Sequence, residues 1–193
     1  MKDIPELDRR PILVAVAGPN GAGKTTFYHA HIAPAALRYV SADILARELE
    51  MDPYAAANAA TAIRRALLGQ KESFAFETVF SDPVGDKLDF LKEAVAAGYT
   101  VVLCFIGLED AALSEERVAM RVSQGGHDVP SEKLKPRFPR TMANLKAAIA
   151  ALPLVYVFDN SDLRRPFRRV AVFRNSRPEA KVKDLPEWLK GLA

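Results

Sequence analysis

Residues 18–25 read Gly-Pro-Asn-Gly-Ala-Gly-Lys-Thr and match the pattern G-x-x-x-x-G-K-[ST] at every fixed position. The glycines of this pattern let successive backbone N–H groups turn toward phosphate oxygens. Its lysine reaches the β- and γ-phosphates, and the hydroxyl of its last residue binds Mg²⁺. We therefore predict a site for ATP and Mg²⁺, in which Lys24 also acts in catalysis and Thr25 binds the metal. The residues of this segment, here called the glycine loop, that are expected to hold ATP are Gly18, Pro19, Asn20, Gly21, Ala22, Gly23, Lys24, Thr25 and Thr26.

Two carboxylates lie at the next predicted strands along the chain. Asp43 follows a short strand near Arg38–Ser41, and Glu77 lies inside the apolar run Phe74–Phe80. A carboxylate in such an apolar strand is costly to bury unless it is paired or faces a ligand. Asp43 could accept a proton from an acceptor hydroxyl, or it could simply cap the helix that follows. Glu77 either faces the glycine loop or lies on the surface at an edge of the sheet.

Four arginines surround the segment GGHDVP, residues 125–130. They are Arg117, Arg121, Arg137 and Arg140, here called the lid arginines. The paired glycines allow a hinge, so these arginines could close over a triphosphate and stabilise charge on the transferred group. A solvated helix surface is the alternative. His127, inside the segment, is assigned no chemistry.

The stretch Asp159-Asn160-Ser161 follows the fifth predicted core strand. Ligands of parallel α/β sheets bind beyond the carboxyl ends of the strands, so we expect Asn160 to contact ATP near its base. A capped turn is the alternative for this stretch.

Strand and helix patterns alternate along the chain. Continuous apolar runs predict strands at Ile12–Ala17, Phe74–Phe80, Thr100–Ile106 and Val155–Phe158, with shorter ones near Arg38–Ser41 and Val170–Phe173. Helices are predicted from about Gly23, over Ile44–Leu49, Tyr54–Leu68, Pro83–Gly98, Ala111–Ser123 and Ser131–Leu152, the last interrupted at Pro136 and Pro139. This order, together with the glycine loop between a strand and a helix, predicts an α/β fold of the P-loop NTPases, a three-layer sandwich. We expect a mostly parallel sheet of five to six strands, helices on both faces, a small helical lid at about residues 111–145, and one domain over residues 1–193.

Composition restricts the location and the partners of the protein. No apolar run approaches the roughly 20 residues that span a bilayer, and the acidic first residues do not form a signal peptide. Cys104 is the only cysteine and lies in the apolar run VVLCFI, so we expect a buried thiol and a cytoplasmic protein. The net charge of +3 is uneven, with nine Lys or Arg and four Asp or Glu from Ser161 onward. We interpret this basic tail as solvated surface and expect neither a membrane nor nucleic acid as a partner.

These motifs together resemble the zeta toxin family of P-loop kinases, with a looser similarity to chloramphenicol phosphotransferase-type kinases. The matching stretches are GPNGAGKTTF, VSADILA, FAFETVFS, RVAMRVSQGGHDVP, RFPRTMANL and VFDNS, in the family's order between about Ile12 and Ser161. Ser41 stands where Asn is commoner, and the chain looks like the short chromosomal branch. The resemblance implies transfer of the γ-phosphoryl group of ATP to a sugar hydroxyl of UDP-N-acetylglucosamine, and inhibition of some members by a small antitoxin protein. It implies that Asp43 is the base, that Glu77 and Thr78 bind the substrate, and that the lid arginines act on the triphosphate.

The sequence thus predicts an ATP- and Mg²⁺-dependent small-molecule kinase, a phosphotransferase with an alcohol acceptor. Its expected catalytic residues are Asp43, Lys24, Arg117 and Arg121, and the expected acceptor is a UDP-activated amino sugar. Two alternatives stay open. The acceptor could instead be a drug, a nucleoside or a polynucleotide end. The chain could also be a nucleotide-dependent binding or regulatory module that hydrolyses ATP without an acceptor.

Overall fold

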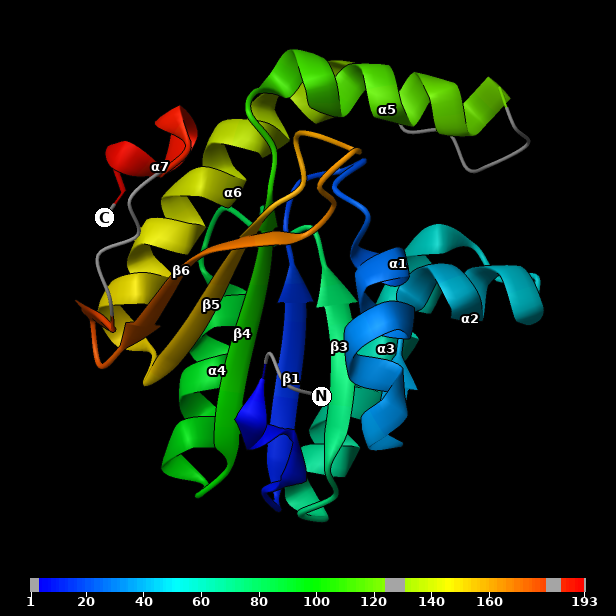
Figure 1. Ribbon diagram of the computed structural model, residues 1–193. Coiled ribbons are helices and arrows are strands. Elements are labelled where there is room, and N and C mark those ends of the chain that lie inside the picture. Colours follow the sequence, from blue (N-terminus) through cyan, green and yellow to red (C-terminus); the bar gives the residue numbers. More distant parts are fainter. Residues whose placement is uncertain (1–3, 124–130, 180–184, 193) are drawn as a thin grey trace.

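The computed structural model describes residues 4–123, 131–179 and 185–192 (Figure 1). Within these residues seven strands form one sheet in the order β2-β3-β1-β4-β5-β6-β7. The strands are β1 (Ile12–Ala17), β2 (Arg38–Val40), β3 (Phe74–Thr78), β4 (Thr100–Gly107), β5 (Leu154–Asp159), β6 (Arg168–Arg174) and β7 (Arg177–Pro178). The first five strands in the sheet order are parallel, whereas β6 and β7 pair antiparallel. The predicted α/β fold with a mostly parallel sheet is confirmed.

The sheet has one strand more than the five or six expected. The additional strand, β7, covers only two residues and forms a hairpin with β6. Asn175 and Ser176 make the turn between them, with φ angles of 48° and 66°. Positive φ at both central residues is the geometry of a tight turn between antiparallel strands. A strand of two residues is too short to produce an apolar pattern, which is why the sequence did not predict it.

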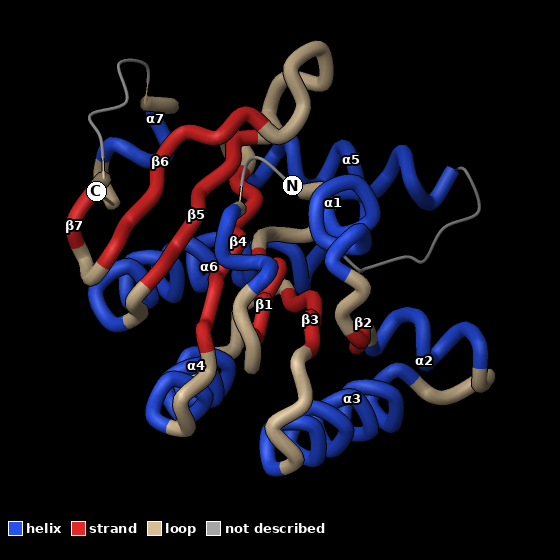
Figure 2. The backbone as a smooth tube through the Cα atoms, turned by 60° about the horizontal axis from the view of Figure 1, so that its bottom comes forward, coloured by secondary structure: helices blue, strands red, loops and turns tan. Residues whose placement is uncertain are grey.

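Helices cover both faces of the sheet (Figure 2). They are α1 (Lys24–Phe27), α2 (Ala42–Glu48), α3 (Pro53–Gly69), α4 (Asp86–Ala96), α5 (Ala111–Ser123), α6 (Ser131–Ala151) and α7 (Glu187–Lys190), with the shorter turns η1 (Pro5–Asp8), η2 (Tyr28–Ile32) and η3 (Ala33–Ala35). Residues of α3, α4 and α6 pack against the sheet face that carries Leu13 and Leu103. Residues of η1, α1 and η2 pack against the opposite face, which carries Val14 and Val102. Neighbouring residues of one strand therefore serve two separate cores, because successive side chains point to opposite faces.

α6 is continuous, although the sequence predicted interruptions at Pro136 and Pro139. Each proline removes one backbone N–H donor and crowds the preceding turn, which is a local cost. Later in the helix, Leu145 and Ala148 are fully buried in the core against the sheet. Packing of such an apolar stripe supplies most of a helix's stability in a folded protein, and it outweighs the cost at the prolines.

The basic segment after Ser161 folds onto the sheet and pairs much of its charge. Arg168 lies 3.2 Å from the carboxylate of Asp159, and Arg174 lies 3.0 Å from that of Glu6. Within the described residues, none of the helices is long and apolar enough to pass through a bilayer. Cys104 is buried in β4, and burial raises the pKa of its thiol, as expected for a cysteine of the core.

Candidate active site

The glycine loop connects β1 to α1 at the carboxyl end of the parallel strands (Figure 1). Gly18, Gly21 and Gly23 have φ angles of 146°, 73° and 85°, which residues with a side chain rarely adopt. The loop is also tightly enclosed. A Cβ at Gly18 would collide with the carbonyl oxygen of Ile106, and one at Gly21 would lie 2.9 Å from the Cβ of Arg117 on α5. Glycine is therefore required at these positions, and the backbone has the course that a phosphate-binding loop needs.

Lys24 begins α1, and its side chain folds back over the glycine loop. Its Nζ donates hydrogen bonds to two carbonyl oxygens of the loop, at 3.0 and 3.1 Å. Burial lowers the pKa of Lys24 to about 8, and Arg121 contributes to the lowering. The carboxylates of Glu77 and Asp43 oppose it. The structure therefore brings both predicted carboxylates and one lid arginine within electrostatic range of the same ammonium group.

Glu77 joins the glycine loop to the start of α2. Its Oε2 accepts a hydrogen bond from Thr25 Oγ1 at 2.9 Å, and its Oε1 accepts one from Ser41 Oγ at 2.6 Å. β3 lies between β1 and β2, so Glu77 is not on an edge strand. The interpretation of Glu77 as an edge residue is therefore wrong, and its half-buried side chain faces the glycine loop.

Ser41, and not Asp43, caps α2. The Oγ of Ser41 accepts a hydrogen bond from the backbone N–H of Ile44, whereas Asp43 is the second residue of the helix and is exposed. The interpretation of Asp43 as the helix cap is therefore wrong. The carboxylate of Asp43 acts electrostatically on Lys24 and raises the pKa of this lysine.

Tyr39 on β2 adjoins these carboxylates and was not predicted from the sequence. Its ring stacks on that of Tyr28, with 3.6 Å between the ring centroids and 10° between the planes. Burial, followed by the carboxylate of Glu77, raises the pKa of Tyr39, so its hydroxyl stays protonated. An aromatic residue in a strand is most often a core residue, which is why the sequence pattern does not mark this position as part of a site.

Thr78 ends β3, and the loop after it is fixed by α6. Thr78 Oγ1 accepts a hydrogen bond from the backbone N–H of Phe80 at 3.0 Å. Thr141 Oγ1 donates to the carbonyl oxygen of residue 79 at 3.0 Å, and Asn144 Nδ2 donates to two further carbonyl oxygens of this loop at 2.9 and 3.0 Å. Thr141 and Asn144 therefore position the loop beside Thr78. In the bond to Phe80 the Thr78 hydroxyl acts as acceptor, so this bond does not use its own proton. Substrate binding by Thr78 stays a prediction.

α5 lies directly on the glycine loop. Ser114 Oγ on α5 donates to the backbone carbonyl oxygen of Asn20 at 2.7 Å. About one turn later, Arg117 donates from Nη2 to the carbonyl oxygen of Ser161 at 3.0 Å. Arg121 is exposed and one turn beyond Arg117, on the same helix face. Two lid arginines therefore border the glycine loop from one side.

The other two lid arginines lie on α6, where Arg137 is half-buried and Arg140 is exposed. Within the part of the chain that the structure describes, neither takes part in an ion pair. The glycine pair expected to act as a hinge, and His127, lie outside the described residues. Closure of the lid arginines over a triphosphate stays a prediction.

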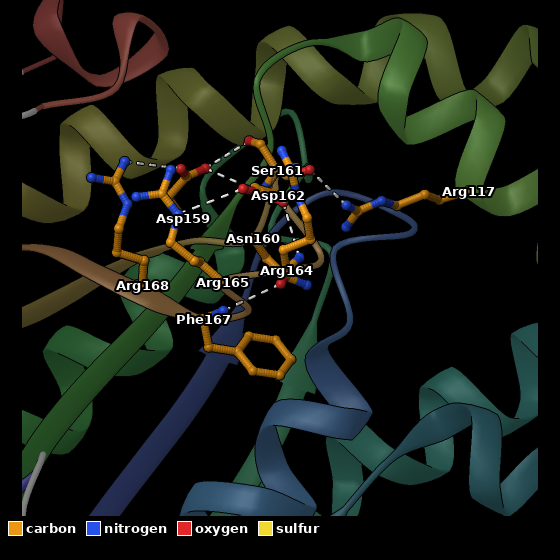
Figure 3. Close-up of polar contacts among 9 residues, drawn as sticks. All are labelled: Arg117, Asp159, Asn160, Ser161, Asp162, Arg164, Arg165, Phe167 and Arg168. Atoms are coloured by element: carbon orange, nitrogen blue, oxygen red, sulfur yellow. Dashed lines mark hydrogen bonds and ion pairs between the residues drawn. The ribbon is translucent and has the colours of Figure 1, made fainter.

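Asn160 braces the glycine loop from the end of β5 (Figure 3). Its Nδ2 donates to the carbonyl oxygen of Ala22 at 2.9 Å, and its Oδ1 accepts from the backbone N–H of Phe167 at 3.2 Å. A Cβ at Gly23 would lie 3.0 Å from the same Nδ2. The side chain is thus committed to holding the loop in place, and only 4% of the residue is exposed. Contact between Asn160 and the base of ATP stays a prediction.

Asp159 fixes the segment that follows β5. Its Oδ1 accepts hydrogen bonds from the backbone N–H and the hydroxyl of Ser161, at 3.2 and 2.6 Å (Figure 3). The same oxygen accepts from Trp188 Nε1 at 3.3 Å, and Oδ2 accepts from Arg168 at 3.2 Å. The capped turn considered for this stretch is therefore present, and it is made by Asp159.

The donor set around Thr25 fits Mg²⁺. The Thr25 hydroxyl and the Glu77 carboxylate are oxygen ligands only 2.9 Å apart, and Mg²⁺ prefers oxygen ligands. Among the described residues, no group of three or more His, Cys, Asp or Glu could hold a metal alone. Mg²⁺ commonly binds through one or two protein oxygens together with substrate phosphates, and the Thr25 and Glu77 oxygens would suit that mode.

No protein-family model and no curated protein sequence matches the chain, but solved structures share its fold. A chain of the AvrRxo1-ORF1:AvrRxo1-ORF2 complex with sulphate ions aligns with a TM-score of 0.73 and 16% identity, over 91% of this chain and 62% of that chain. The same pair of proteins has been crystallised with ATP. A chain of the PezAT chromosomal toxin-antitoxin system of Streptococcus pneumoniae aligns with a TM-score of 0.66 and 16% identity, over 96% and 79% of the two chains. A Chloroflexus aurantiacus protein assigned as a kinase aligns with a TM-score of 0.57 and 19% identity, over 82% and 90%.

At these identities the likeness establishes the fold alone. The chain spans 62% of the AvrRxo1 complex chain that it matches, so that protein is substantially longer than this one.

Proposed function

We propose that this chain, which has the fold of the zeta toxin-like P-loop kinases, transfers the γ-phosphoryl group of ATP to a hydroxyl of a small molecule. The observation that carries the proposal is the double hydrogen bond of Glu77 to Thr25 and Ser41. It joins the glycine loop, which would hold the triphosphate, to the first turn of α2, which carries Asp43. A nucleotide switch has no need for a second carboxylate held opposite its phosphates.

The glycine loop and α5 would supply the positioning and the positive charge that phosphoryl transfer requires. Lys24 would exchange its two carbonyl partners for phosphate oxygens. Thr25, whose hydroxyl is hydrogen-bonded to Glu77, would hold Mg²⁺. When bound, the metal ion would stabilise the negative charge of the phosphates. Arg117 and Arg121 would stabilise the negative charge that develops on the transferred group, since they approach the glycine loop from α5, on the side opposite to α2.

Asp43 would orient the acceptor hydroxyl and accept its proton as the new bond to phosphorus forms. Because Ser41 caps the helix, the carboxylate of Asp43 is not used in holding α2. Its exposure leaves it accessible to a substrate. We propose Thr78, whose hydroxyl is fixed at the end of β3, as a further contact for the acceptor.

A UDP-activated amino sugar is the acceptor that we propose first, on the strength of the motif resemblance. The PezAT neighbour is a toxin-antitoxin system, and by analogy we also propose a small inhibitory protein as a partner of this chain. A nucleoside, a drug or a polynucleotide end are the other acceptors to be tested. Binding of a polynucleotide would weaken steeply with added salt, whereas binding of a small acceptor would not.

The test is incubation of the full chain with γ-labelled ATP, Mg²⁺ and a panel of UDP-sugars, nucleosides and oligonucleotides. We expect label to appear on one class of acceptor, and the transfer to disappear in a folded Lys24→Ala protein. Transfer that persists in Lys24→Ala would contradict the role of the glycine loop. Hydrolysis of ATP with no labelled acceptor, at a rate that the panel does not change, would favour the regulatory ATPase instead.

A further inference from the structure

Arg64, on α3, is buried and has no anionic partner among the described residues. Only 6% of the residue is exposed, and no ion pair joins it to any residue that the structure describes. Its guanidinium donates one hydrogen bond, from Nη2 to Thr61 Oγ1 at 2.8 Å, and lies 5.0 Å from the ring centroid of Phe76. A guanidinium has five N–H donors, and this bond uses one of them. No Arg64 nitrogen is among the buried side-chain atoms without a hydrogen-bond partner, so its remaining donors are open to solvent or to a ligand.

A buried charge without a counter-ion is costly for a fold. Burial, with a smaller effect of Arg65, lowers the pKa of Arg64 to about 10, so the side chain is still charged at neutral pH. Proteins normally pair buried charges, and an unpaired one is strongly unfavourable. The contact with the Phe76 ring compensates only partly, since a cation over an aromatic ring is a weaker interaction than an ion pair with hydrogen bonds.

The position of Arg64 relates it to the site. Side chains on a helix point toward its N-terminus, and the hydrogen bond of Arg64 to Thr61 follows that direction. α3 ends just before β3 begins, so this direction leads toward the carboxyl end of the parallel strands, where the glycine loop and Thr78 lie. Phe76 and Thr78 are two residues apart on β3 and share one face of the sheet. Arg64 therefore lies on the same face as the residue proposed to contact the acceptor.

We propose that Arg64 binds an anionic group of the acceptor, a phosphate or a carboxylate. This inference rests on the proposed kinase function, because it assigns a chemical property to the acceptor of that reaction. The planar fork of a guanidinium matches both oxyanions in a bidentate manner. The ligand would supply the counter-ion that the described part of the chain does not provide, and the site would select charged acceptors over neutral ones.

The neighbouring Arg65 provides a matched control. It also lies over an aromatic ring, at 5.9 Å from the centroid of Phe90, but 61% of its side chain is exposed. It already has a counter-ion, since its Nη1 lies 3.2 Å from the carboxylate of Glu93. Replacing Arg65 removes an arginine of the same helix without removing an unpaired buried charge.

The test is the thermal unfolding of the full chain, with the glycine loop saturated by Mg²⁺ and a non-hydrolysable ATP analogue. Wild type, Arg64→Met and Arg65→Met are each titrated with inorganic phosphate and, separately, with acetate. Ligands that bind only the folded state raise Tm. We expect one or both anions to raise the Tm of wild type and Arg65→Met by about 2–4 °C at saturation, and to leave Arg64→Met unchanged. The anion that acts identifies the group on the acceptor.

Without added anion, Arg64→Met should unfold at the Tm of wild type or above it, because the substitution removes an uncompensated buried charge. A clear fall in this Tm would instead assign Arg64 a structural role and overturn the proposal. The proposal would also be overturned if phosphate and acetate shifted all three proteins equally, or shifted none.

Should Arg64→Met fail to fold, NMR of the wild-type protein tests anion binding at Arg64 directly. The signal of the Arg64 Nε–H group is assigned by its absence from the spectrum of Arg64→Lys. A saturable shift with phosphate or acetate supports the proposal, and an unchanged signal contradicts it. Failure of wild type to bind the ATP analogue would count against the proposed function. Binding of the analogue with no response at Arg64 would count against this inference alone.

Discussion

ATP binding should take up a proton at Lys24 at alkaline pH. Burial lowers the pKa of Lys24 to about 8, and its ammonium group is held by two carbonyl oxygens of the glycine loop. When phosphate oxygens replace these carbonyls, their negative charge favours the ammonium form and raises the pKa. Wherever free Lys24 is neutral, the nucleotide therefore binds together with a proton.

The size of the effect follows from the pKa. With a value of about 8, roughly one-tenth of Lys24 is neutral at pH 7, half at pH 8 and nine-tenths at pH 9. If ATP restores the ordinary value, binding takes up about half a proton at pH 8 and about 0.9 proton at pH 9. The Kd for ATP should then increase nearly tenfold for each pH unit above about 8.5.

Titration calorimetry measures this uptake when each titration is repeated in two buffers with different ionisation enthalpies. The assay would use Mg²⁺ with a non-hydrolysable ATP analogue at about pH 7, 8 and 9. Lys24→Arg is the matched control, because arginine keeps the positive charge and does not lose its proton in this range. The reasoning would be refuted by equal proton uptake in wild type and Lys24→Arg at pH 9, or by a Kd for wild type that does not change between pH 8 and pH 9.5.

The same lowered pKa has a consequence for the stability of the protein without ligand. Below about pH 8 Lys24 is charged in both the folded and the unfolded chain. The full free-energy cost of burying its ammonium group then lowers the free energy of unfolding. Between about pH 8 and pH 10.5 the unfolded chain binds more protons at this site than the folded one, so Lys24 should raise the free energy of unfolding of wild type relative to Lys24→Arg, by up to about 3 kcal/mol. Groups whose pKa is raised on folding, such as Cys104, affect both proteins alike. Denaturant titrations of the two proteins across this range would measure the difference between them.

Five substitutions test the remaining roles. Asp43→Asn should lower transfer to the acceptor by roughly 10²–10⁴-fold with little change in ATP affinity; full activity in this variant would leave the reaction without its base. Ser41→Ala should cost about 1 kcal/mol of unfolding free energy and also lower activity, because it removes both a helix cap and a hydrogen bond to Glu77. Asp52→Ala, which removes the cap of α3, should cost a similar amount in denaturant titrations and leave activity unchanged. Alanine at Arg117 or Arg121 should lower kcat more than it weakens ATP binding, and steady-state kinetics showing normal kcat in both variants would remove them from catalysis.

The glycine loop was predictable because its requirements are local. Three positive φ angles within six residues and a close approach to β4 can be met only by glycine, and a buried strand before the loop is visible as a continuous apolar run. The long helices and core strands were predictable for the same reason, since their periodic patterns lie within one segment of the chain. Prediction failed at β7, which is too short to produce an apolar pattern, and at α6, which is continuous although its prolines predicted interruptions.

The contacts that turn the loop into a site are not local, and the sequence leaves them undetermined. Glu77 lies 52 residues from Thr25 and 36 from Ser41, yet its two oxygens join them. From the sequence, Asp43 was considered as the helix cap, and nothing within the segment shows that the hydroxyl two residues earlier takes that role. Whether a polar residue caps a helix or serves a substrate depends on which partner the sheet brings beside it. Because Ser41 fills the cap of α2, Asp43 is not needed as the cap, and this strengthens the case for Asp43 as the base.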